Sequence, residues 1–135
     1  MRPPGEQVLS PLWPHLEACA PKEGCALLWR GPDGERLQLM RNAAPAVAAR
    51  TGFQLDEAEW LSASLRAERG GERLAWIIHS HVDRAPWLSG EDRAAASLHP
   101  GVGWLVVSLL GRHADACALY PSPGDSRVSG GLEPG

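Results

Sequence analysis

Two apolar runs without polar alternation limit the fold of this chain more than any other feature. Residues 74–79 read LAWIIH, and residues 103–110 read GWLVVSLL. Runs of this kind are typical of central strands that are buried on both faces of a sheet. Both are far shorter than the roughly 20 apolar residues that cross a bilayer, so we expect no membrane-spanning segment.

Apolar residues recur at helical spacing in two other segments, residues 5–19 and residues 57–68, and predict a helix in each. The second helix follows Asp56, which is a good N-cap. Its expected buried stripe is made of Ala58, Leu61 and Leu65. A shorter helix is expected to begin after Ser89 and to end near residue 98.

A β-hairpin is predicted where residues 24–30 and residues 36–41 flank the turn sequence Gly-Pro-Asp-Gly. Residues 114–120 predict a last strand. Helices and strands mixed in this order indicate an α/β or α+β domain around one sheet.

The length of 135 residues is that of one domain. We expect a flexible start over residues 1–4, a folded domain over residues 5–120 and a disordered tail over residues 121–135. The net charge of −3 argues against nucleic acid and anionic membranes as partners. Three cysteines and no signal-peptide pattern favour free thiols in a reducing cytoplasm.

The most informative polar residues follow the first apolar run. His79 and His81 lie two positions apart on the expected strand, so both imidazoles point to the same face. Asp92, near the start of the next helix, is the best third ligand. Two histidines and a carboxylate, with a fourth position open, form the layout of a catalytic zinc site. Each half also has a structural reading, because H-x-H is a short pattern and Ser89 with Asp92 forms an ordinary capping box.

The complete pattern is more specific, because it reproduces the signature H-x-H-x(7)-S-x(2)-D. In this respect the chain resembles the JAB1/MPN/Mov34 metalloenzymes, also called JAMM proteases. Glu23 matches the upstream glutamate of that family, and Asn42 followed by residues 53–56 (FQLD) is similar to a stretch of its small bacterial members. The resemblance implies a single mixed sheet flanked by helices, with cytidine-deaminase-like layering. One departure is Val82, where many members have proline.

The resemblance also implies a function, that of a zinc-dependent peptidase or isopeptidase. His79, His81 and Asp92 would hold one Zn²⁺, Glu23 would be the general base, and Ser89 would stabilise the oxyanion. The expected substrate is the C-terminus of a ubiquitin-like protein or of a ThiS- or MoaD-like sulfur carrier. The sequence indicates no oligomeric state.

Three other interpretations compete with this one. The segment from His79 to Arg84 matches most of the H-x-H-x-D-H motif of metallo-β-lactamase-fold hydrolases, with Asp83 as its acid and Arg84 in place of the last histidine. That fold needs a much longer chain, so we regard the match as accidental. A non-catalytic MPN-type scaffold and a zinc-binding module that recognises a ubiquitin-like tail are the remaining alternatives.

Overall fold

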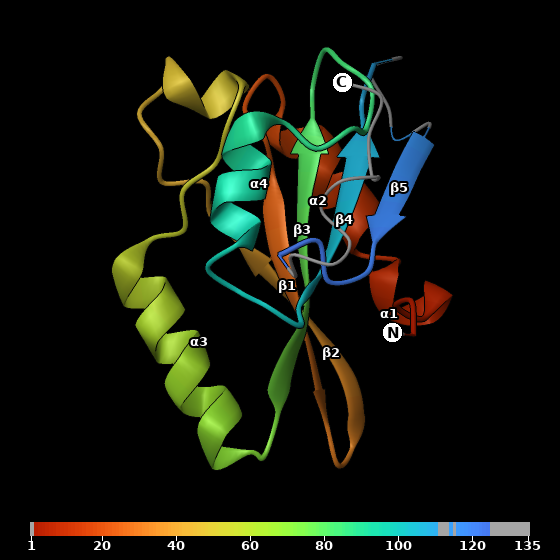
Figure 1. Cartoon of the computed structure of the whole chain (residues 1–135), viewed down its shortest axis with the longest axis vertical. Coiled ribbons are helices and arrows are strands. Elements are labelled where there is room, and N and C mark those ends of the chain that lie inside the picture. Colours follow the sequence, from red (N-terminus) through yellow and green to blue (C-terminus); the bar gives the residue numbers. More distant parts are fainter. Residues whose placement is uncertain (1, 111–113, 115, 125–135) are drawn as a thin grey trace.

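A five-stranded mixed sheet lies at the centre of the protein in this computed structural model (Figure 1). The structure describes residues 2–110, 114 and 116–124. The strands are β1 (Cys25–Gly31), β2 (Gly34–Met40), β3 (Arg73–His81), β4 (Gly103–Ser108) and β5 (Ala116–Tyr120). Their order across the sheet is β2-β1-β3-β4-β5, and β3 and β4 are its parallel pair. The other neighbouring strands are antiparallel.

The two apolar runs become β3 and β4, which confirms that they are central strands buried on both faces. Because β3 and β4 are parallel, the chain must cross over between them, and α4 (Gly90–Ala96) lies in that connection. β3 continues two residues beyond the expected end, to His81. The hairpin of β1 and β2 also forms as predicted, with Gly31 paired to Gly34 at its turn.

Helices cover both faces of the sheet (Figure 1). The remaining helices are α1 (Glu6–Leu9), α2 (Leu12–Cys19), α3 (Glu57–Arg69) and the short 3-10 helix η1 (Ala48–Arg50). α1 and α2 contribute leucines to the core on one face, whereas α3 and α4 contribute alanines to the core on the other. None of the helices in the described part of the chain has the length and apolar character that a membrane span requires. The expected mixed, helix-flanked sheet is therefore confirmed.

The first helix differs from the prediction, because residues 5–19 form two helices instead of one. α1 ends at Leu9, and α2 begins at Leu12, directly after Pro11. Pro11 has no backbone N–H to continue the hydrogen bonding of α1, and the first turn of a helix is where a proline is tolerated.

The buried stripe of α3 was predicted wrongly. Leu61 and Leu65 are 59% and 43% exposed, whereas Ala63 and Ala67 are buried against the sheet. Trp60 packs on the same core cluster. The helix therefore meets the sheet through small side chains and one large aromatic ring, and its leucines face away.

The residues before α1 are hydrogen-bonded to strand β1. Near the start, the Arg30 guanidinium donates hydrogen bonds to the carbonyls of Arg2 and Pro3 at 2.6 and 3.0 Å. At the other end, the expected disordered tail lies outside the described residues from position 125 onward.

Candidate metal centre

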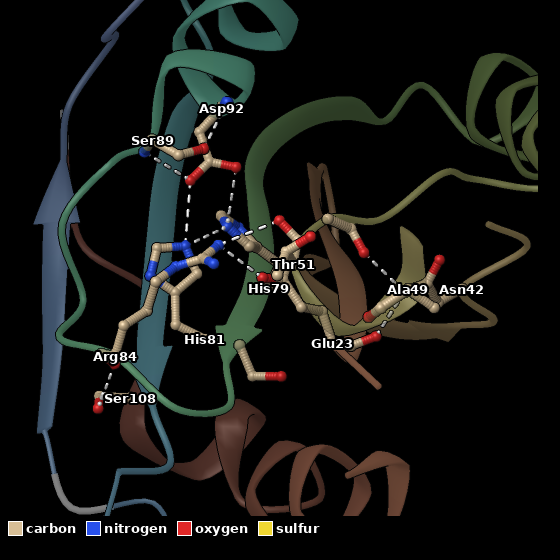
Figure 2. A network of polar contacts seen from close by, with 12 residues as sticks. Glu23, Asn42, Ala49, Thr51, His79, His81, Arg84, Ser89, Asp92 and Ser108 are labelled. Carbon is tan, nitrogen blue, oxygen red and sulfur yellow. Dashed lines mark hydrogen bonds and ion pairs between the residues drawn. The ribbon is translucent and has the colours of Figure 1, made fainter. Parts of the chain in front are cut away.

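His79, His81 and Asp92 meet at the end of β3 (Figure 2). The Nε2 atoms of the two histidines are 3.2 Å apart. Oδ1 of Asp92 lies 3.2 Å from His79 Nε2, and its Oδ2 lies 3.1 Å from His81 Nε2. Ligand atoms that bind a tetrahedral ion at about 2.0 Å are themselves about 3.3 Å apart. The spacing of these three groups therefore fits a tetrahedral metal ion.

Local hydrogen bonds orient the side chains of His81 and Asp92. His81 Nδ1 lies 2.8 Å from the carbonyl oxygen of Ala85, and a carbonyl can only accept, so this nitrogen carries the proton and Nε2 is left free. Asp92 belongs to the predicted capping box. Its backbone N–H donates to Ser89 Oγ, and Ser89 N–H donates back to Asp92 Oδ2, both at 3.0 Å. Capping thus fixes the carboxylate without occupying its Oδ1.

Glu23 reaches the same place from the other side. It lies two residues before Cys25, which pairs with His79 in the antiparallel β1–β3 register. Its backbone N–H donates to the Ala49 carbonyl at 2.6 Å, and Asn42 Nδ2 donates to its carbonyl at 2.9 Å. Glu23 is fully buried. One ligand atom from each of Glu23, His79 and His81 lies within 4.8 Å of the others, so these buried residues can hold a metal ion.

The protonation states of the cluster also suit a metal. Burial lowers the pKa of His79, which keeps its imidazole neutral near pH 7. Burial opposes the ionisation of Asp92, but the two histidines beside it and the hydrogen bond from Ser89 N–H outweigh burial and hold the pKa of Asp92 well below its usual range. Neutral imidazoles and an ionised carboxylate are the forms that bind metals.

Glu23 differs from Asp92 in its charge state. Burial raises the pKa of Glu23 to about 8, and Arg84 opposes this shift. A carboxylate that titrates near neutral pH can accept a proton and return it under cellular conditions, which is the property required of a general base.

Two aromatic rings pack against His79. Phe53 stacks on His79 with ring centroids 4.8 Å apart, and Trp104 meets the same ring edge-on at 5.4 Å. Asp56, from the same FQLD stretch, caps α3 by accepting a hydrogen bond from Glu59 N–H at 3.0 Å. The stretch therefore contributes one ring that packs on His79 and one helix cap.

Two contacts near the cluster were missed from the sequence. Ser80, the middle residue of H-x-H, accepts a hydrogen bond from Gly24 N–H at 2.8 Å and so fastens the segment of Glu23 to β3. Arg84 Nη2 donates to Glu23 Oε2 at 2.8 Å. The signal for Arg84 was a lone cation just after the histidine pair, between Asp83 and the acidic start of α4.

The same contacts bear on the metallo-β-lactamase motif. Asp83, its acid, is exposed, and Arg84, at its last ligand position, is paired with Glu23. The match to that motif is therefore accidental, as expected.

A mixed sheet covered by helices on both faces, with a histidine pair at the end of a central strand beside a buried glutamate, defines a domain of the JAB/MPN class. The profile of prokaryotic homologues of the JAB domain matches residues 5–121, and the chain belongs to this family. No curated protein matches the chain.

Solved structures share the fold, and three of them illustrate the likeness. A protein from Desulfitobacterium hafniense is 24% identical with a TM-score of 0.63, and the match covers 84% of this chain and 77% of that one. A protein from Salinibacter ruber is 24% identical with a TM-score of 0.58, over 85% and 78% of the two chains. A JAB1/MPN domain protein from Archaeoglobus fulgidus is 16% identical with a TM-score of 0.55, over 87% of each chain.

Proposed function

We propose that the chain is a zinc-dependent hydrolase of the cytoplasm that cleaves a peptide or isopeptide bond at the C-terminus of a ubiquitin-like protein or of a ThiS- or MoaD-like sulfur carrier. His79, His81 and Asp92 would hold the zinc ion, and Glu23 would be the general base. The observation that carries the proposal is the buried Glu23 carboxylate beside the histidine pair, within 4.8 Å.

Zinc bound to this cluster would polarise the scissile carbonyl and activate a water molecule. Glu23 would take a proton from the attacking water and pass it to the leaving amine, a task that suits its pKa of about 8. Ser89 Oγ accepts from Asp92 N–H, and its own hydrogen has no acceptor among the described residues. The hydroxyl is therefore available to donate to the oxygen that becomes negative during hydrolysis.

A non-catalytic zinc-binding module is the second candidate. It is favoured by one observation, the ion pair that already occupies one carboxylate oxygen of Glu23. In such a module Glu23 and Arg84 would close the site and leave the metal with a structural or recognition role.

Replacement of Glu23 by glutamine separates the two candidates. The substrate is a probe peptide ending in Gly-Gly, joined by an isopeptide bond to a lysine side chain, with a fluorophore and a quencher on opposite sides of that bond. Zinc-loaded wild type should cleave this isopeptide probe. Glu23→Gln should keep one zinc per chain and lose cleavage, whereas Glu68→Gln, on the exposed face of α3, should retain both. Equal cleavage by Glu23→Gln and wild type would show that Glu23 is not the base.

The ligand assignment has its own test, which does not depend on the substrate. A double variant, His79→Ala with His81→Ala, should lose the zinc measured by elemental analysis of the purified protein. Zinc affinity of the wild type should also fall at acidic pH, because a bound imidazole must be unprotonated. Unchanged zinc content in the double variant would refute the assignment.

A further inference from the structure

We propose that Arg84 positions the general base, by holding Oε2 of Glu23 so that Oε1 alone remains free to take and return a proton. The inference rests on the hydrolase function proposed above. It starts from an ion pair between residues 61 positions apart in the chain, with Arg84 Nη2 2.8 Å from Glu23 Oε2. Figure 2 shows Arg84 reaching from the loop after β3 toward Glu23.

The contact gives the two carboxylate oxygens of Glu23 different surroundings. Arg84 uses one nitrogen, Nη2, which also donates to the Thr51 carbonyl at 3.2 Å. Oε1 of Glu23 is buried and has no hydrogen-bond partner among the described residues. A guanidinium could bind both oxygens of a carboxylate in parallel, and that arrangement would leave neither free. The observed contact binds one oxygen and leaves the other available.

The loop that carries Arg84 is fastened to three strands. Three successive backbone carbonyls, those of residues 84–86, each accept a hydrogen bond from a side chain of the sheet. The donors are Ser108 on β4 at 2.9 Å, His81 on β3 at 2.8 Å and Tyr120 on β5 at 2.8 Å. A loop that moved away from the site to release Glu23 would have to break these three hydrogen bonds. The anchoring favours a fixed positioning role instead.

The acidic groups around Glu23 favour a cation at the position of Arg84. Asp92, Glu91 and Asp83 all lie close enough to Glu23 to act on its charge, and each repels a second carboxylate. Arg84 is the cation that opposes them among the groups that act on Glu23 in the described structure. Without this guanidinium, the carboxylate would lose the contact that fixes its rotation, and proton transfer would lose its geometry.

The ion pair is tested first in metal-free protein at about pH 9, where Glu23 with its pKa of about 8 is ionised, by urea unfolding of Arg84→Gln, Glu23→Gln and the double variant. Arg84→Gln should lower the unfolding midpoint, because it leaves a buried carboxylate without its partner, and adding Glu23→Gln should restore most of the loss. The matched control is the pair of Arg36 and Glu72, also 2.8 Å apart. Its carboxylate is 16% exposed, whereas that of Glu23 is fully buried; the arginines are 23% and 33% exposed. Its cycle should show a smaller coupling.

The positioning role is tested with zinc-loaded protein and the isopeptide probe. Arg84→Gln should keep its zinc and its KM within about twofold, while kcat falls by about tenfold to a hundredfold, since a misplaced catalytic group costs rate more than binding. Arg84→Lys should recover part of kcat, and added ethylguanidinium should partly rescue Arg84→Ala. Arg36→Gln should leave kcat and KM unchanged.

Each contrary result has a distinct meaning. A rise in kcat for Arg84→Gln would make the ion pair an inhibitory latch, and a rise in KM alone would make Arg84 a substrate-binding residue; both overturn the proposal. Unchanged kcat with intact coupling would reduce Arg84 to a structural role, and absent coupling would remove the ion pair itself. An inactive zinc-loaded wild type would count against the hydrolase, and the positioning role would fall with it, whatever the metal-free coupling.

Discussion

Asn42 ties the segment of Glu23 to the loop that follows it, and its replacement by alanine should destabilise the fold strongly. Its Nδ2 donates to the carbonyls of Glu23 and Gly52 at 2.9 and 3.0 Å. Its Oδ1 accepts from the backbone N–H groups of Ala44 and Gln54 at 3.0 and 3.1 Å. A fifth bond, from Nδ2 to the Ala49 carbonyl, is longer at 3.4 Å. The four shorter bonds at about 0.5–1.5 kcal/mol each, reduced for the partial exposure of the site, give a loss of about 2–4 kcal/mol.

The measurement is equilibrium unfolding in urea, followed by circular dichroism and by tryptophan fluorescence. For a small domain with a slope of about 1–3 kcal/mol/M, the midpoint should fall by at least about 0.7 M at an unchanged slope. Gln54→Ala is the matched control, because that exposed side chain makes no hydrogen bond among the described residues and should cost less than about 0.5 kcal/mol. If Asn42→Ala costs no more than this control, water replaces the amide and the four bonds do not fasten the segment.

Two further predictions concern the same segment. Gly24→Ala should cost about 1–3 kcal/mol, because the new Cβ would lie 2.8 Å from Leu16 Cδ2, whereas Gly90→Ala, with nothing within 4 Å, should be nearly neutral in the same urea titration. In metal-free protein, Glu23, with its pKa raised from 4.5 to about 8, keeps a proton that the unfolded chain releases. Stability should therefore fall as pH rises, by about 1 kcal/mol between about pH 7 and pH 8.5, in wild type but not in Glu23→Gln.

The elements predicted best were those with a strong local pattern. The run LAWIIH fixed β3 as a central strand, and the spacing of His79 and His81 placed both imidazoles on one face, where the structure has them. Ser89 and Asp92 form the expected capping box. In each case the decisive information lies within a few residues, so one sequence is enough.

The predictions failed where contacts between distant parts of the chain determine the structure. On α3, both Ala58-Leu61-Leu65 and Trp60-Ala63-Ala67 have helical spacing, and the closeness of the helix to the sheet selected the second set. The ion pair of Arg84 with Glu23 joins residues 61 positions apart, and no local pattern announces it. Side-chain contacts between separate loops depend on the assembled fold, which periodicity does not describe.

The polar atoms of the cluster that lack hydrogen-bond partners lower the stability of the metal-free fold. Glu23 Oε1 and His79 Nδ1 are buried without hydrogen-bond partners among the described residues, and each such group costs about 1–3 kcal/mol. The core clusters on the two faces of the sheet hold the strands together without these residues. A structural role alone would be served better by apolar side chains at the same positions. Buried titratable groups with partnerless polar atoms at a well-spaced histidine pair instead support the proposed metal site and general base.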